Sequence, residues 1–136
     1  MSTRQRRLSK AVWRLVGLVA LAPCFNTAEA GPVRDRLRQI ANQKKQDYQY
    51  RKGIYETAKW LEGNLAAKTG PAWDAYQAVP DSNPTLKQVK YRAWQEVSEQ
   101  YRRAKSQRAR EYTAMRAAKR AWLRAEREWQ MCPVGK

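Results

Sequence analysis

The stretch from Pro84 to Met131 constrains the fold more than any other part of the chain. It contains no Gly and, after Pro84, no Pro. Starting at Trp94, every seventh position carries a large side chain, and the position three residues later is mostly small. The two sets are Trp94, Tyr101, Arg108, Met115, Trp122 and Trp129, and Val97, Ala104, Ala118 and Ala125, with Tyr112 filling the turn where residue 111 is Glu. This spacing is typical of a helix that packs along another helix. Such a helix would be roughly 70 Å long at about 1.5 Å per residue.

A first helix is expected before this one, over residues 33–69. Its apolar positions run from Val33 to Leu65 on one face. Thr69-Gly70-Pro71 predicts its end, because Gly favours the position after a helix and Pro cannot continue one. Residues 72–79 then indicate a short helix. The turn cluster from Pro80 to Asn83 follows, and Asn83 is expected to cap the long helix, residues 84–131.

The predicted architecture is therefore all-α, an antiparallel, coiled-coil-like helical hairpin with a short helix at its turn. A short connection returns the chain on itself, so the two long helices should run antiparallel. No segment shows the alternation of a strand. Because the first helix is expected to be about a dozen residues shorter, one end of the long helix should extend beyond it.

The N-terminus has the features of a secretory signal peptide. Basic residues at 4, 6, 7 and 10 precede an apolar run at 11–22, and Ala28-Glu29-Ala30 has the small-x-small pattern of a cleavage site. Cleavage after Ala30 predicts a periplasmic or secreted single domain of residues 31–136. Three alternatives remain open: an uncleaved anchor in the inner membrane, a mitochondrial presequence, and acylation at Cys24.

The composition argues against catalysis. The chain has no His and only two Cys, which removes the commonest general base and leaves no cluster of metal ligands. The acidic residues are scattered among basic ones, without a pair that favours acid–base chemistry. We therefore expect a protein that is not an enzyme, with no cofactor, no metal and no small-molecule substrate.

The net charge points to an anionic partner. The whole chain carries +16, and removal of residues 1–30 leaves 23 basic and 11 acidic residues, or +12. This exceeds what solubility requires. The candidate partner-binding residues share the long helix outside its apolar stripe: Arg102, Arg103, Arg110, Arg116, Arg120, Arg124 and Arg127.

Two further features of the long helix are candidates for interaction. Trp122 and Trp129 share the apolar stripe, which favours packing between the helices. Because one end of the long helix should extend beyond the first helix, they are also a candidate for an exposed hydrophobic partner patch. Cys132 is the one thiol left after cleavage and falls in the expected C-terminal tail. An accessible lone Cys in an oxidising compartment predicts an intermolecular disulfide.

One segment resembles a known family. Residues 117–124, followed by Glu126, Arg127 and Cys132, are similar to the signature AAQRAWLxYRDxEC of the LprI-type lysozyme-inhibitor domain. Lys119 replaces the Gln of that signature, Ala125 replaces its Tyr, and Cys132 comes two positions late. The resemblance implies an exported helical binder of lysozyme. The long basic helical arms after a signal peptide also resemble the architecture of the periplasmic chaperone Skp.

These observations favour an exported, non-enzymatic helical binding or scaffold protein of the bacterial envelope. It would engage an anionic surface or a client protein, and a thin hairpin favours a homo-oligomer. Other functions remain open: a lysozyme-inhibitor-like binder, an accessory component of a secretion or conjugation apparatus, or, without export, a nucleic-acid-binding hairpin.

Overall fold

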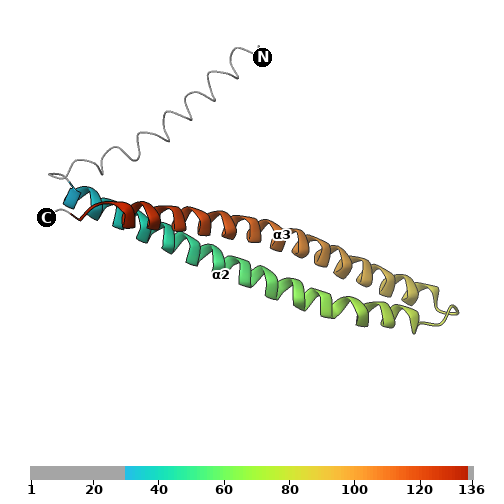
Figure 1. The fold of residues 1–136 in the computed structure, drawn as a ribbon. Coiled ribbons are helices and arrows are strands. Elements are labelled where there is room, and N and C mark those ends of the chain that lie inside the picture. Colours follow the sequence, from blue (N-terminus) through green and yellow to red (C-terminus); the bar gives the residue numbers. More distant parts are fainter. Residues whose placement is uncertain (1–29, 135–136) are drawn as a thin grey trace, which may run out of the picture. The chain divides into compact units, whose positions relative to one another are not determined.

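The computed structural model describes residues 30–134 and consists of two helices over that range (Figure 1). Helix α2 spans Ala30–Gln77 and helix α3 spans Pro84–Met131. No strand occurs among the residues described, as the sequence predicts. The predicted signal peptide lies outside this range except for Ala30. Neither α2 nor α3 is apolar over a length that would cross a bilayer.

The chain divides into two compact units, which are described separately. The terminal unit contains residues 30–46 and 119–134, so the beginning of α2 packs beside the end of α3. The turn unit contains residues 47–118 and includes the connection between the helices. Within each unit the α2 and α3 segments run in opposite directions (Figure 1). The predicted all-helical hairpin is confirmed at this level.

Helix α3 begins and ends where the sequence predicts. The Asn83 side chain caps its first turn, because Oδ1 accepts a hydrogen bond from the Leu86 amide at 3.2 Å. The Asn83 carbonyl accepts the first helical bond from the Lys87 amide at 3.1 Å. At the other end, the Cys132 amide donates to the Trp129 carbonyl at 3.2 Å. The three-residue spacing of that bond tightens the last turn.

Helix α2 does not end at Thr69, and the prediction of a separate short helix at residues 72–79 is wrong. The helix continues through Gly70 and Pro71 to Gln77. Gly70 has no Cβ to clash with the proline ring, which removes part of the usual obstacle before Pro. Beyond Pro71 the helix gains ring contacts to α3: Trp73 lies 4.8 Å from Trp94 between centroids. Both helices are therefore 48 residues long, and the predicted overhang of the long helix is absent.

The line of contact between the helices is narrow and rich in alanine. The buried apolar residues among those described are Ala41, Ala58, Val79, Ala104, Ala118, Ala125 and Cys132. The last four of these, three on α3 and Cys132 just after its end, follow the period of seven apart from position 111. There Glu111 is half-buried, whereas Tyr112, which was expected to fill this turn, is 41% exposed. Tyr112 instead flanks the contact line, with its ring centroid 5.5 Å from that of Tyr55.

A charged pair lies within the contact line of the turn unit. Glu62 of α2 forms an ion pair with Arg108 of α3, and the Glu62 side chain is only 15% exposed. The pKa of Arg108 is raised, first by a hydrogen bond with Tyr55 and then by the charge of Glu62. A charged pair at such a position favours one register of the two helices over others, because a shifted register would leave both charges without partners.

Candidate anionic-partner surface

Positive charge is densest in the terminal unit. Its 33 described residues contain nine basic and three acidic side chains, whereas the 72 residues of the turn unit contain thirteen and eight. The nine, which we call the terminal basic surface, are Arg34, Arg36, Arg38, Lys44, Lys45, Lys119, Arg120, Arg124 and Arg127. Eight of them are exposed. All four ion pairs among the described residues lie in the turn unit, so these cations have no carboxylate partner within that part of the chain.

Basic side chains of α2 cover the two tryptophans at the end of α3. The guanidinium carbons of Arg34 and Arg38 each lie 5.7 Å from the Trp129 ring centroid. The Lys45 ammonium lies 5.7 Å from the Trp122 ring centroid. Such contacts attract a cation to the face of the ring and contribute about 0.5–1 kcal/mol each at exposed sites. These contacts use ring faces rather than carboxylates, so they leave the positive charges without neutralisation.

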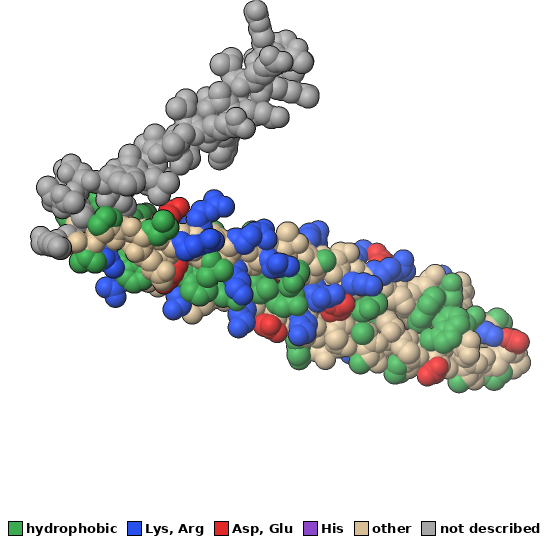
Figure 2. Space-filling model, in the orientation of Figure 1, with side chains coloured by type: hydrophobic (Ala, Val, Ile, Leu, Met, Phe, Trp, Pro, Cys, Tyr) green, Lys and Arg blue, Asp and Glu red, His purple; other side chains and the backbone are tan. Residues whose placement is uncertain are grey.

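The prediction of Trp122 and Trp129 as an exposed hydrophobic patch is therefore wrong. Both side chains are half-buried. The Trp122 Nε1–H donates to Glu126 Oε2 at 2.9 Å, so its polar end is bound within α3. The patch was inferred from an overhang that does not exist, since α2 extends far enough to cover this end of α3. Positive charge is exposed in this unit beside other apolar side chains, such as Met131 and Leu123 (Figure 2).

The seven arginines predicted to bind a partner are all exposed, but they divide between the units. Arg120, Arg124 and Arg127 belong to the terminal unit and recur at four- and three-residue spacing, which places them on one face of α3. The other four lie in the turn unit: Arg102, Arg103, Arg110 and Arg116. Of these, Arg103 is paired with Glu99, and Arg116 lies 5.7 Å from the Tyr112 ring centroid. The terminal group has fewer competing contacts.

Sequence reasoning missed the contribution of α2 to this surface. Arg38 and Lys45 are seven residues apart, as are Trp122 and Trp129. In an antiparallel pair of helices such a spacing lets both cations meet both rings in one register. The match was visible in the sequence, but the expected overhang placed the tryptophans beyond the reach of α2.

Cys132 is not in an accessible tail. Its side chain is 2% exposed, and it continues the period of seven that runs through Ala118 and Ala125. Arg34 Nη1 lies 3.5 Å from the Cys132 carbonyl, which places α2 beside this end of the chain. The thiol is free in the structure. The accessibility on which the predicted intermolecular disulfide depended is therefore absent.

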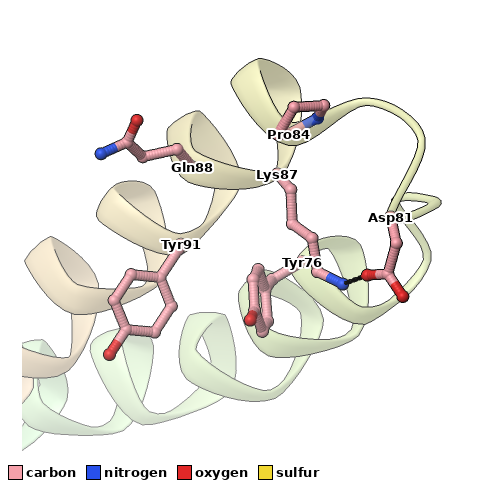
Figure 3. A pocket seen from close by; sticks show the side chains of 6 residues that line it. All are labelled: Tyr76, Asp81, Pro84, Lys87, Gln88 and Tyr91. Carbon is pink, nitrogen blue, oxygen red and sulfur yellow. Dashed lines mark hydrogen bonds and ion pairs between the residues drawn. The ribbon is translucent and has the colours of Figure 1, made fainter.

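Charged side chains also line two shallow pockets of the turn unit, one along α3 with Glu99, Arg102, Arg103 and Arg110, and one at the hairpin turn (Figure 3). The pocket at the turn contains a lysine. Its volume is about 390 Å³, and Tyr76 and Tyr91 face it from the two helices. Lys87 forms an ion pair with Asp81. The hydrogen bond from Lys87 lowers the pKa of Asp81, and the same bond raises the pKa of Lys87. The lysine of this pocket is therefore already neutralised by the turn. No group of three or more metal-ligating side chains is present among the described residues.

Comparison with known proteins gives no relative for this chain. No protein-family model, no curated protein and no solved structure matches it.

Proposed function

We propose that this chain is a non-enzymatic helical binding protein that attaches to an anionic surface of the bacterial envelope through its terminal basic surface. Residues 1–30 would direct its export, and the mature protein would be periplasmic or secreted. The observation that carries the proposal is the excess of six positive charges over 33 described residues of the terminal unit, without an ion pair among them.

The chemistry of these side chains favours phosphate and carboxylate groups. Six of the nine cations are arginines, whose planar N–H donors match both anions in a bidentate geometry. Because Arg34 and Arg38 rest on the Trp129 ring, they lose less freedom when an anion binds. The half-buried tryptophans are not open to stacking on bases, which favours an anionic surface over single-stranded nucleic acid.

Binding to vesicles tests the proposal. The full chain is expected to sediment with vesicles containing an anionic phospholipid and not with purely zwitterionic vesicles. A basic residue near an anionic membrane contributes about 1 kcal/mol, so replacing three should weaken binding about 100-fold. The variant is Arg120→Gln, Arg124→Gln and Arg127→Gln.

A variant of equal charge in the turn unit is the matched control: Lys68→Gln, Lys90→Gln and Arg92→Gln. All three side chains are exposed. Because a general attraction would respond equally to both triple variants, equal losses would refute a role for the terminal basic surface. Salt should weaken binding in either case. Binding to an acidic protein or to double-stranded DNA with no binding to anionic vesicles would redirect the proposal to those partners.

A further inference from the structure

The turn unit has an uncharged groove along α2, with one wall from α3. Its volume is about 430 Å³, and its lining includes Tyr50, Gly53, Ile54, Leu61 and Gln107. Every residue that lines it is uncharged, in a chain of which 29% is charged. Lys52 and Lys59 belong to the same helix but follow Tyr50 and Thr57 by two residues, which places them about 200° away around it. The basic side of α2 therefore faces away from the groove.

Two unusually exposed aromatic side chains belong to this side of α2: Tyr50 lines the groove, and Trp60 lies beside it, seven residues after Gly53. Trp60 is 68% exposed and Tyr50 is 67% exposed, the two most exposed rings among the described residues. An aromatic side chain has about 150–250 Å² of area that can be buried, so these two leave about 200–330 Å² uncovered. Within the turn unit, the contact line with α3 runs beside the groove, since the buried Ala58 belongs to both, and it leaves these two rings exposed.

We infer that a second copy of this chain occupies the groove, with the two α2 helices antiparallel about a two-fold axis near residues 55–56. The stripe Tyr50, Ile54, Thr57 and Leu61 has spacings of four, three and four, which read the same in both directions. An antiparallel copy therefore places Tyr50 opposite Leu61 and Ile54 opposite Thr57. A two-fold interface requires this reciprocity, in which each residue meets its counterpart twice.

The same axis brings the large side chain of Trp60 close to Gly53, which has no side chain. Gly53 and Trp60 are seven residues apart and so lie on one edge of the stripe. A Cβ at Gly53 would meet nothing within 4 Å in this chain, so the space above it is open. In the antiparallel pair, Trp60 of each copy lies two residues, about 3 Å along the helix, from the position opposite Gly53 of the other, which is within reach of its ring. The exposed ring and the vacant position thus complement each other across the interface.

Charge permits a second copy to occupy the groove. Two chains of equal positive charge repel one another except where their contacting faces are neutral. This groove is neutral, and the cations Lys52 and Lys59 would point outward from the pair. The rings supply less than half of the ~800 Å² that each partner buries in a standard interface, so the dimer should dissociate at micromolar concentrations.

Sedimentation velocity of the full chain tests the inference, over a concentration range of roughly 1–200 µM around the expected dissociation constant. A monomer–dimer equilibrium is expected. Trp60→Ala should raise the dimer dissociation constant at least about tenfold, because exposed aromatic anchors dominate such interfaces. Val89→Ala, which truncates a 56% exposed side chain outside the groove, is the control and should leave the constant unchanged.

Gly53→Leu distinguishes an effect on dimer formation from an effect on the stability of the monomer. Leu favours the helix over Gly, and its side chain meets nothing in the monomer, so the monomer should melt at a higher temperature. The same side chain occupies the space that Trp60 needs, so the dimer should be lost. A monomer throughout the concentration range overturns the inference. So does a dimer that survives both Trp60→Ala and Gly53→Leu. The result is independent of vesicle binding, because neither residue belongs to the terminal basic surface.

Discussion

Replacing Pro71 by Ala tests the most unexpected feature of the fold, the passage of α2 through a proline. In the structure, residue 71 lies inside a helix that continues to Gln77. The proline ring has no N–H to donate to the Ala67 carbonyl and crowds that carbonyl, so the helix is weakened at this turn. Pro71→Ala restores the donor and removes the crowding. The variant should therefore be more stable than the natural protein.

The size of the gain follows from two opposing terms. Pro costs about 3 kcal/mol relative to Ala in a helix interior. Removing Pro also makes the unfolded chain more flexible, which costs about 0.4–1 kcal/mol. The net gain is therefore about 2 kcal/mol. For a domain of about 100 residues, 1 kcal/mol corresponds to about 4–8 °C, so the melting temperature should rise by at least about 8 °C.

Thermal melting followed by far-ultraviolet circular dichroism measures this change. Adding Gly70→Ala to Pro71→Ala gives a second, independent test of the continuous helix. No described glycine has a positive φ, and a Cβ at Gly70 would meet nothing within 4 Å. In a continuous helix the second change should therefore add about 1 kcal/mol.

A helix that ended at Thr69 would give opposite results. Pro71 would then stand at the first position of a new helix, where proline is favourable, and Gly70 would follow a helix end, where Ala is strained. An unchanged or lowered melting temperature in Pro71→Ala, with a further loss on adding Gly70→Ala, would refute the continuous helix.

Three other changes test other parts of the structure. Gly63→Ala should raise stability by about 0.5–1 kcal/mol in urea unfolding, because Gly63 is exposed inside α2 and has open space at Cβ; a loss would show a contact that the structure lacks. Glu62→Leu and Arg108→Leu should each lower the melting temperature, and combining them should recover most of the loss, since neither charge is then left alone; additive losses would contradict the pairing. Asp81→Asn should lower the melting temperature by a similar amount from about pH 5 to 9, and the difference should shrink at both extremes. Because the pKa of Asp81 lies below 3.8, its contribution is present above that pH and is lost as the pH falls through the lowered value. Because the pKa of Lys87 lies above 10.5, its contribution is present below that pH and is lost as the pH rises through the raised value. A difference that does not depend on pH would rule out the pair.

Helix α3 could be predicted from the sequence because its signals agree. Asn83 caps it, Pro84 begins it, and the large and small side chains recur at one spacing up to Met131. No Gly or internal Pro opposes this pattern. Local preference and contact with a second helix therefore demand the same structure, and sequence reasoning succeeds where they do.

The end of α2 could not be predicted from local chemistry, because local preference and packing against α3 favour different structures there. Gly70-Pro71 favours a break, but half-buried and buried positions continue across it at intervals of seven, as Leu65 and Ala72 of α2 and Val79 just after its end. Trp73 and Tyr76 then stack on rings of α3. Aromatic pairs contribute about 0.5–1.5 kcal/mol beyond their buried area, which together with that area offsets the cost of proline. The period of seven was visible in the sequence. It outweighs the evidence for a break at Pro71 only when the contacts with the partner helix are known.

The terminal basic surface was predicted in part: its residues on α3 were found from the sequence and its residues on α2 were not. The arginines of α3 were found because charge on an exposed face needs only the helix to be right. The cations of α2 were missed because the expected overhang placed Trp122 and Trp129 beyond the reach of α2. The wrong end of α2 thus led to two wrong predictions, the overhang and the exposed patch, whereas the accessible Cys132 was predicted from an expected C-terminal tail.

The two proposals together predict that vesicle binding depends on protein concentration. A dimer carries two terminal basic surfaces, so both subunits can bind the same vesicle. Binding of the second subunit raises the apparent affinity without any new kind of contact. Trp60→Ala should therefore weaken binding to anionic vesicles above the dimer dissociation constant and leave it unchanged below. Direct participation of Trp60 in the membrane contact would instead weaken binding at every concentration. If the dimer is lost and vesicle binding is unaffected throughout the range, the paired surfaces do not act together, because one surface then accounts for all of the affinity.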